Sequence, residues 1–242
     1  MVEHFKAIVL KVVRHSEKTQ IVDMLTDSYG RMAFAVPAPS ASRRGVRSRT
    51  LWRPLNILEF ESDLKAAKGM PRPKDVSLAY VYSVMTFDPL RSMIAMYVDE
   101  LLCASIWGEL PDVALFEFVR RSLLLLDNPD CKFRLFHIAF ALNLLQYIGI
   151  QPNMERVDNE PFFDLRAAEF VAIHPLHSDV LESREAADFQ RLMRMNYRNM
   201  HLYRLNRNQI VRTLEVISQY YSLHLPNFKG VNATQFFHDA LS

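Results

Sequence analysis

Several classes of protein depend on residues that this 242-residue sequence has in short supply. It contains two cysteines, too few for a disulfide framework or a four-cysteine zinc site. Its six glycines form none of the motifs GxxxxGKS/T, GxGxxG or GxSxG, and HExxH does not occur either. No apolar run reaches about 18 residues, the length that a membrane-spanning helix needs. We therefore expect neither a disulfide-rich secreted protein, nor a membrane protein, nor an enzyme of these motif classes.

The remaining composition is that of a folded protein. The sequence is 50% hydrophobic and 23% charged, which permits a sizeable buried core. At roughly 150 residues per domain, the length allows one large domain or two small ones. Lys6 and Lys11 interrupt the N-terminal stretch His4–Val13, which argues against a signal peptide or a membrane anchor. Because Cys103 and Cys131 also lie in apolar segments, we expect a protein of the reducing cytoplasm.

The net charge of +2 hides an uneven distribution. Residues 1–80 hold 14 Lys and Arg against 8 Asp and Glu, whereas residues 81–242 hold 15 against 19. No acidic residue lies between Asp27 and Glu59. The arginines that gather there are Arg43, Arg44, Arg47, Arg49 and Arg53. Local charge governs contact with a polyanion more than the total does, so this stretch is a candidate binding surface.

Short β-rich runs dominate the first 80 residues. We expect strands at Phe5–Arg14, Ile21–Thr26, Arg31–Val36 and Leu55–Phe60. The turn Asp27–Gly30 joins the second and third strands, because glycine readily adopts the positive φ of a tight hairpin. An arginine-rich loop over residues 40–53 precedes the fourth. Several strands within about 60 residues, joined in this way, are typical of a small β-barrel.

The hydrophobic period becomes helical after about residue 80. Apolar residues recur at helical spacing in residues 94–102, 116–126, 133–144, 189–200 and 210–221. Asp130 is a candidate N-cap for the third segment and Gly149 a candidate stop. Between residues 150 and 183 the periodicity fails. The sequence thus predicts an α+β protein, with a β-barrel over residues 1–80 and an all-α domain over residues 81–242.

One cluster invites interpretation as a metal site. His174 and His177 have the spacing at which two histidines can share a metal ion, and Asp179 follows them. Such a site would support a metal-dependent hydrolase, if the fold brought further carboxylates to it. The alternative, and the commoner case, is a proline-containing surface loop that happens to hold histidines. We therefore expect no catalytic residue, no metal and no cofactor.

The arginine-rich stretch Arg43–Arg53 is the stronger functional signal. Arginine binds phosphate through a planar fork of donors and also stacks on bases. Proteins that bind single strands combine such a groove with aromatic platforms, and Trp52 is the leading candidate here. Phe5, Tyr29 and Phe34 are weaker candidates. The competing interpretation is that Trp52 packs inside the barrel and the arginines form a solvated loop.

A second basic set lies between Phe189 and Leu214, where no acidic residue occurs. Its members are Arg191, Arg194, Arg198, Arg204, Arg207 and Arg212. If residues 189–200 form a helix, the first three fall on one face. A solvated face explains them most simply, although the same face would suit DNA or an acidic peptide.

Several short motifs along the chain resemble those of one family. They begin with Ala7-Ile8-Val9-Leu10, Ser16-Glu17, Leu25-Thr26 and Gly30-Arg31. They continue with Pro54-Leu55, Phe133-Arg134-Leu135-Phe136, Gly149 near Pro152, Phe162-Phe163-Asp164 and the ending Tyr220-Tyr221-x-x-His224-Leu225-Pro226-x-Phe228-Lys229. In order and spacing, these motifs resemble the RecO family of DNA repair and recombination mediator proteins over nearly the whole chain.

The resemblance implies a fold and a set of partners. Members have an N-terminal OB-fold and a C-terminal helical domain, in agreement with the layout inferred above. They bind single- and double-stranded DNA, anneal complementary strands, and contact the acidic, hydrophobic C-terminal tail of single-stranded-DNA-binding protein. With RecR they help to load RecA onto coated single strands. The implied partners are therefore DNA, RecR, this tail and, indirectly, RecA, with no membrane.

Charge and burial patterns suggest residues for two of these contacts. For DNA we expect Arg14, Arg31, Arg43, Arg44, Arg47, Arg49, Trp52 and Arg53. The tail needs an apolar pocket rimmed by Arg or Lys, to take a terminal Phe and its carboxylate. The basic residues near apolar helix faces are Arg120, Arg121, Lys132 and Arg134. Surface charge and core packing are the competing explanation for each of them.

The chain departs from the family pattern in two places. Many members carry a four-cysteine zinc site flanking the segment that corresponds to Phe162-Phe163-Asp164. Here the first pair is missing, and His174 and His177 fall roughly where the second pair would be. Because two ligands do not hold a structural zinc ion, we expect a zinc-free version organised by aromatic packing. The other departure is Pro37-Ala38-Pro39, where the family usually has a glycine and basic residues, so the positive charge is displaced to Arg43–Arg53.

An RNA-binding OB module in translation or tRNA handling would fit the basic barrel equally well. Preference for RNA over DNA of the same sequence would favour it, because the 2′-hydroxyl distinguishes the two backbones. Neither this module nor the hydrolase explains the similarity at both ends of the chain.

Overall fold

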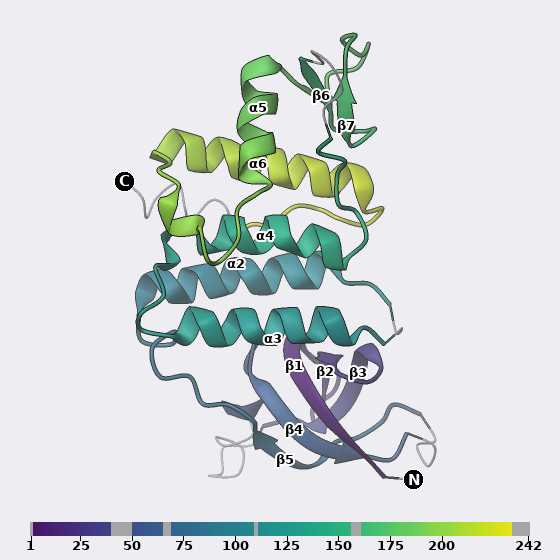
Figure 1. Ribbon diagram of the computed structural model, residues 1–242. Coiled ribbons are helices and arrows are strands. Elements are labelled where there is room, and N and C mark those ends of the chain that lie inside the picture. The colour runs from purple at the N-terminus through teal and green to yellow at the C-terminus, as the bar shows by residue number, and fades with distance from the viewer. Residues whose placement is uncertain (1, 40–49, 65–68, 109–110, 156–160, 234–242) are drawn as a thin grey trace. The chain divides into compact units, whose positions relative to one another are not determined.

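The computed structural model (Figure 1) describes all residues except 1, 40–49, 65–68, 109–110, 156–160 and 234–242. The chain divides into two compact units. The first comprises Met1–Ala95 and Ile106–Pro129, and the second comprises Met96–Ser105 and Asp130–Ser242. The first unit therefore holds the N-terminal strands, the start of helix α2 (Pro89–Ser105) and helix α3 (Val113–Asp127).

An antiparallel sheet of five strands dominates the first unit. The strands are β1 (Glu3–Arg14), β2 (Thr19–Thr26), β3 (Gly30–Pro37), β4 (Ile57–Ser62) and β5 (Lys74–Leu78). Their order is β3-β2-β1-β4-β5, which places the longest strand, β1, at the centre (Figure 1). The core on one face contains Phe5, Phe34 and Phe60, whose ring centroids lie 5.1–5.9 Å apart. The four predicted strands are confirmed, with ends that shift by at most two residues.

The hairpin between β2 and β3 forms at the predicted turn. Gly30 has a φ of 66°, and the Thr26 hydroxyl donates to its carbonyl oxygen at 2.8 Å. The same hydroxyl accepts a hydrogen bond from the Tyr29 N–H at 3.0 Å. Glycine adopts this conformation without the steric penalty of a Cβ atom, so the turn sets the register of the two strands.

The predicted closed OB barrel is not confirmed, because the sheet stays open. β5 is short, and its pairing with β4 changes register partway along. Loops cover the opposite edge: the N–H of Ala35 in β3 donates to the carbonyl oxygen of Pro71 at 2.9 Å, and that of Arg31 to Gly108 at 3.1 Å. Among the described residues, these two N–H groups at the β3 edge thus bond to loops. In a closed barrel, they would pair with another strand instead.

The second unit is built around helix α4 (Phe136–Tyr147), in which nine of twelve residues are buried. The other elements with helical conformation are η1 (Phe133–Leu135), α5 (Ser183–Leu192), η2 (Met200–Leu202), α6 (Arg207–His224) and the last part of α2. The Tyr221 hydroxyl of α6 donates to the Ala141 carbonyl oxygen of α4 at 2.8 Å. No helix within the described ranges combines the length and the apolar character needed to span a membrane.

The sequence predicted an all-α second unit, but this unit contains a small sheet in the structure. Its irregular segment contains an antiparallel sheet in the order β7-β6-β8, made of β6 (Phe162–Asp164), β7 (Glu169–Val171) and β8 (Val180–Leu181). Strands of two or three residues are too short to show alternation, which explains the missed prediction. Phe163 is fully buried and packs on Phe170 and Phe189, with ring centroids 5.1 and 5.3 Å away. The expected aromatic packing of this segment is confirmed for Phe163, whereas Phe162 is half-buried and contacts the His174 ring.

The predicted end of α4 at Gly149 is confirmed, but its predicted start at Asp130 is wrong. Asp130 is not an N-cap, because the chain enters η1 after Lys132 and α4 begins only beyond it. Gly149 has a φ of 74° and follows the last turn of α4, as expected of a helix stop.

The predicted helix over residues 189–200 is also shorter in the structure. α5 ends at Leu192 and turns follow. Arg191, Arg194 and Arg198 therefore do not share a helical face.

Candidate functional site

Of the residues predicted to contact DNA, some lie outside the described residues, some are exposed and one is buried. Four of them lie outside the described residues: Arg43, Arg44, Arg47 and Arg49. Arg14, at the end of β1, and Arg53 are exposed. Trp52 is buried in the core of the sheet with Phe5 and Phe34. These three rings are therefore not exposed stacking platforms, and the assignment of Trp52 is corrected.

Arg31 is engaged within the first unit, which corrects its assignment as a phosphate contact. Its guanidinium donates to Asp23 Oδ2 from Nε at 3.0 Å and from Nη2 at 2.6 Å. Its Nη1 donates to the carbonyl oxygen of Ile106 at 2.6 Å. The guanidinium carbon also lies over the Trp107 ring, 5.2 Å from the centroid. Arg31 therefore joins β2, β3 and the loop after α2, and Asp23 offsets its charge.

Trp107 is an exposed aromatic residue that the sequence patterns did not single out. It exposes 59% of its surface, whereas Trp52, the other tryptophan, exposes 7%. It lies in a short loop after α2 that carries neither basic residues nor a hydrophobic period. Its ring contacts Arg31, which lies far away in the sequence, so the local sequence pattern gives no sign of this contact.

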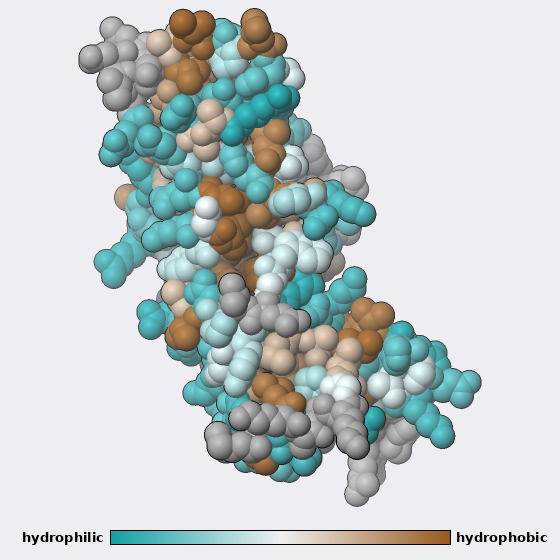
Figure 2. Space-filling view, turned by 90° about the vertical axis from the view of Figure 1, so that its right-hand side faces the viewer, coloured by the Kyte–Doolittle hydropathy of each residue, from teal (hydrophilic) through white to brown (hydrophobic). Residues whose placement is uncertain are grey.

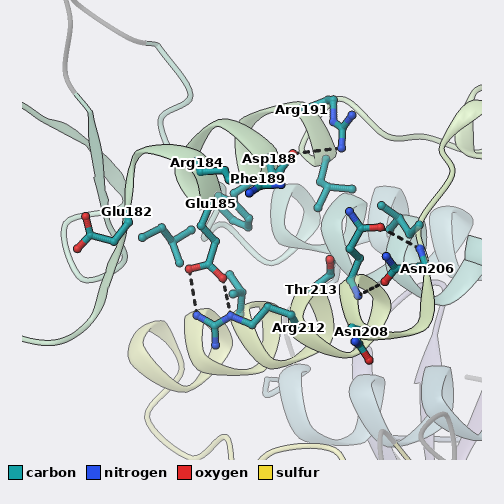
Figure 3. A pocket seen from close by; sticks show the side chains of 15 residues that line it. Glu182, Arg184, Glu185, Asp188, Phe189, Arg191, Asn206, Asn208, Arg212 and Thr213 are labelled. Carbon is teal, nitrogen blue, oxygen red and sulfur yellow. Dashed lines mark hydrogen bonds and ion pairs between the residues drawn. The ribbon is translucent and has the colours of Figure 1, made fainter.

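The second unit has an open groove between α5 and α6, with a volume of about 500 Å³ (Figure 3). Apolar side chains from both helices and from the segments before them form its floor. They are Leu181, Phe189, Leu192, Leu205 and Val216. Because this floor is apolar and open to one side, the groove can take a large hydrophobic side chain of another molecule.

Charged side chains form the rim of this groove, and the pair of Glu185 with Arg212 joins α5 to α6. Glu185 of α5 accepts two hydrogen bonds from the guanidinium of Arg212 on α6, with Oε2 3.1 Å from Nη2 (Figure 3). This pairing raises the pKa of Arg212 above its usual value. Asp188 Oδ1 accepts from Arg191 Nη2 at 3.2 Å. The Glu185–Arg212 pair thus links α5 and α6 beside the apolar floor, whereas the Asp188–Arg191 pair lies within α5.

One end of the groove is basic. Nη2 of Arg134, in η1, donates to the carbonyl oxygen of Leu205 at 3.4 Å, and Leu205 lines the groove. Arg204 precedes Leu205 in the chain, and Arg207 begins α6 two residues later. The N-terminus of α6 adds the partial positive charge of its helix dipole, although the Asn206 side chain already caps the Gln209 N–H at 3.0 Å. An anionic group would therefore be favoured at this end.

The four residues predicted to contact the partner tail fall in different units. Arg120 and Arg121 lie on α3 in the first unit, and both pair with Glu117, at 2.8 and 3.3 Å. Lys132 and Arg134 are exposed residues of the second unit. Of the two pairs, the second is the one that the structure connects to the groove, through Arg134.

Two family models together cover most of the chain. The model described as Recombination protein O N terminal matches residues 1–82, and the model described as Recombination protein O C terminal matches residues 86–231. The chain belongs to the RecO family. This confirms the resemblance found in the sequence motifs.

Individual relatives extend the similarity to RecO proteins over nearly the full length. The DNA repair protein RecO of Bacteroides fragilis is 34% identical over 229 residues, which is 94% of each chain. That of Phocaeicola vulgatus is 34% identical over 228 residues, again 94% of each chain. That of Flavobacterium psychrophilum is 30% identical over 224 residues, 93% of this chain and 92% of the relative.

In this member of the RecO family, the histidines of the small sheet have separate partners. His177 Nε2 lies 3.2 Å from Asp164 Oδ2, and His174 Nε2 lies 3.2 Å from Glu182 Oε1. Asp179 accepts hydrogen bonds from other side chains. Within the described part of the chain, no group of three or more His, Cys, Asp or Glu could hold a metal ion. The trio that a hydrolase would need is therefore not assembled.

Loop residues at the tip of this sheet are apolar and exposed. Ile173 and Leu176 lie in the connection from β7 to β8 and are among the most exposed hydrophobic residues of the protein. Figure 2 shows hydrophobic side chains at its upper end, where this sheet lies.

Proposed function

We propose that the protein is a DNA repair and recombination mediator. It binds single- and double-stranded DNA, anneals complementary strands and, with RecR, helps to load RecA onto strands coated by single-stranded-DNA-binding protein. The observation that carries this proposal is the match to both RecO family models along the chain. The protein would act in the cytoplasm, where a bacterial chromosome lies, and without catalysing a chemical step.

Charge neutralisation is the proposed mechanism of annealing. Two DNA strands repel each other through their phosphates. Arginines of the stretch Arg43–Arg53 would bind phosphates of both strands and lower this repulsion, so that complementary bases can pair. No step needs ATP or an active site. Because binding releases counterions, affinity must fall as salt rises.

The affinity for single-stranded DNA is expected to depend steeply on salt. For roughly 4–5 contacted phosphates, the slope of log K against log salt is about −3 to −3.5. Changing Arg43, Arg44, Arg47 and Arg49 together to alanine should flatten the slope by up to about 2.8, at about 0.7 per lost contact. Fluorescence anisotropy of a labelled strand over a salt series measures the slope. Adding the complementary strand without ATP then measures annealing.

A matched variant separates position from net charge. Changing Arg194, Arg198, Arg204 and Arg207 to alanine removes the same charge from the second unit, and most of the slope should persist. An unchanged slope in the first variant would show that DNA binds elsewhere. Tighter binding of RNA than of DNA of the same sequence would favour the RNA-binding module instead.

We further propose that the groove between α5 and α6 receives the C-terminal tail of single-stranded-DNA-binding protein. The tail requires an apolar pocket for its terminal Phe and a cation for its carboxylate. The floor around Phe189 and Leu205 supplies the pocket. Arg134, at its Leu205 end, supplies one cation, and Arg191, which lines the groove and pairs with Asp188 through Nη2, supplies a second.

The double variant Arg134→Ala, Arg191→Ala is expected to weaken binding of an acidic peptide ending in Phe by about tenfold or more. A hydrogen bond to a charged group contributes about 1.5–3 kcal/mol, and about 1.4 kcal/mol corresponds to tenfold. The matched control is Arg120→Ala, Arg121→Ala on α3, which should bind the peptide as the wild type does. Isothermal titration calorimetry compares them. The reverse pattern would move the site to α3, and equal losses would mean that net charge alone matters.

A further inference from the structure

The ion pair of Glu185 with Arg212 lies in the groove between α5 and α6, and both residues line it (Figure 3). The Glu185 carboxylate occupies the planar fork of the guanidinium, because Nε donates to Oε1 and Nη2 donates to Oε2 at 3.1 Å. Arginine binds carboxylates in general through this two-point geometry. A carboxylate-binding fork in the groove is therefore occupied by a side chain of the protein itself.

The charges that line the groove cancel. Three cations and three anions contribute: Arg184, Arg191, Arg212, Glu182, Glu185 and Asp188. Asp188 pairs with Arg191 within α5, and Glu185 pairs with Arg212 across the two helices. An acidic ligand therefore gains little attraction from these arginines unless it replaces one of their carboxylate partners.

The Glu185–Arg212 pair is placed where such a replacement costs little. The Arg212 side chain is 50% exposed, and that of Glu185 is 33% exposed. Ion pairs within reach of water contribute little to stability, so exchanging one carboxylate for another is nearly neutral. Glu215, three residues further along α6, accepts from Arg212 Nη1 at 3.4 Å. This second partner keeps the guanidinium oriented when Glu185 leaves.

We propose that Arg212 binds an acidic side chain of the tail, and that Glu185 occupies its fork while the groove is empty. The proposal rests on the tail binding proposed above and names the residues that select the ligand. Because the pair joins α5 to α6, a peptide that lies along the groove meets it. A purely apolar peptide separates the pair without replacing it, and a purely acidic one only exchanges partners. A peptide that is both acidic and apolar restores the pair and covers the floor.

The geometry of α6 also places the acidic residue within the peptide. The terminal carboxylate belongs at the basic end of the groove, beside the start of α6. Arg212 lies five residues beyond Arg207, the first residue of this helix, which is about 7.5 Å along the axis. An extended chain covers this distance in about two to three residues. Arg212 therefore meets an acidic residue two or three positions before the terminal Phe.

Glu185→Gln is expected to tighten binding of a peptide that ends in Phe and carries Asp at these two positions. The gain should be about two- to fivefold, the range for one exposed charge pair, because the amide competes less well for the fork. Combined with Arg212→Ala, the same change should bring no gain, since the fork is then absent. Isothermal titration calorimetry on the full-length protein measures all three affinities.

Glu182→Gln is the matched control. It removes the same charge from the lining of the same groove, but the Glu182 carboxylate lies 3.2 Å from His174 Nε2 and is not a partner of Arg212. Its gain should be smaller than that of Glu185→Gln. Equal gains, or a gain that persists without Arg212, would refute the exchange and leave only a general effect of charge.

A second peptide, with Asn in place of Asp at both positions, tests the contact from the side of the ligand. The wild type should bind the Asp peptide more tightly than the Asn peptide by about two- to fivefold for each exposed pair that is lost. Arg212→Ala should bind the two peptides with similar affinity. An undiminished preference for Asp in this variant would show that another cation receives the acidic residue.

The outcomes separate this inference from the proposed function. If the wild type binds the Asp peptide, the Arg134→Ala, Arg191→Ala variant binds it more weakly, and Glu185→Gln brings no gain, the exchange is refuted while the groove stands as the site. If neither the wild type nor Glu185→Gln binds the peptide, both proposals fail.

Discussion

Replacing Asp127 with alanine is expected to lower the free energy of unfolding by about 3–5 kcal/mol. Asp127 is the last residue of α3 and is 1% exposed. Its carboxylate accepts hydrogen bonds from the backbone N–H groups of Ser83, Val84 and Met85 at 2.7–3.1 Å, and from the Tyr80 hydroxyl at 2.9 Å. Alanine leaves these donors without an acceptor; the Met85 N–H is buried, the Val84 N–H and the Tyr80 hydroxyl are partly buried, and a buried unsatisfied donor costs about 1–3 kcal/mol.

The contribution of Asp127 to the free energy of unfolding also depends on pH, and it decreases in acid. Burial opposes ionisation, but the N–H groups of Met85, Ser83 and Val84 and the Tyr80 hydroxyl outweigh it, so the pKa of the carboxyl lies below its usual 3.8. A carboxyl with a lowered pKa stabilises the folded state above the unfolded pKa and loses this effect as the pH falls through the folded value. The difference in the free energy of unfolding between the wild type and Asp127→Asn should therefore become smaller below about pH 4.

Urea denaturation followed by circular dichroism measures these differences. Asp112→Ala is the matched control, because Asp112 caps the other end of the same helix and accepts from the Leu115 N–H at 2.8 Å. Loss of an N-cap costs about 1 kcal/mol. Equal losses for the two variants would contradict the larger role assigned to Asp127.

Phe163→Ala is expected to cost about 3–5 kcal/mol and to open the small sheet of the second unit. Phe163 lies on the central strand β6, is fully buried and packs on Phe170 and Phe189. Removing its ring leaves a cavity where three aromatic rings now meet. Since aromatic packing organises this segment, we expect no metal ion to compensate for the loss.

Hydrogen exchange followed by mass spectrometry should show faster exchange over residues 162–181 in Phe163→Ala. Phe162→Ala is the matched control: Phe162 points to the opposite face of β6 and contacts His174, so its loss should cost about 1 kcal/mol. Treating the wild type with EDTA should leave its exchange and its Tm unchanged. A fall in Tm with EDTA would contradict the zinc-free organisation.

Local patterns were sufficient where local chemistry controls the structure. The strands of the hairpin are rich in apolar residues, and Gly30 takes the positive φ that the turn needs. α6 ends just before Pro226, which cannot continue a helix. The order and spacing of the motifs also identified the family, because these are properties of the chain itself.

The two tryptophans show what local sequence patterns could not predict. Trp52 stands beside Arg49 and Arg53 in the sequence, which favoured it as a stacking platform. The structure buries it, and exposes Trp107 instead. Burial depends on which elements pack over a side chain, and neighbours in the sequence do not reveal that.

The sequence by itself determined the family, the main strands and helices, and the concentration of arginine before residue 54. Only the tertiary structure decided that the sheet is open, that a small sheet lies in the second unit, and that Arg31 pairs with Asp23 beside Trp107. The physical reason is the distance along the chain between the residues that interact. Periodicity shows which side of an element is buried, whereas strand edges and ion pairs are completed by residues far away in the chain.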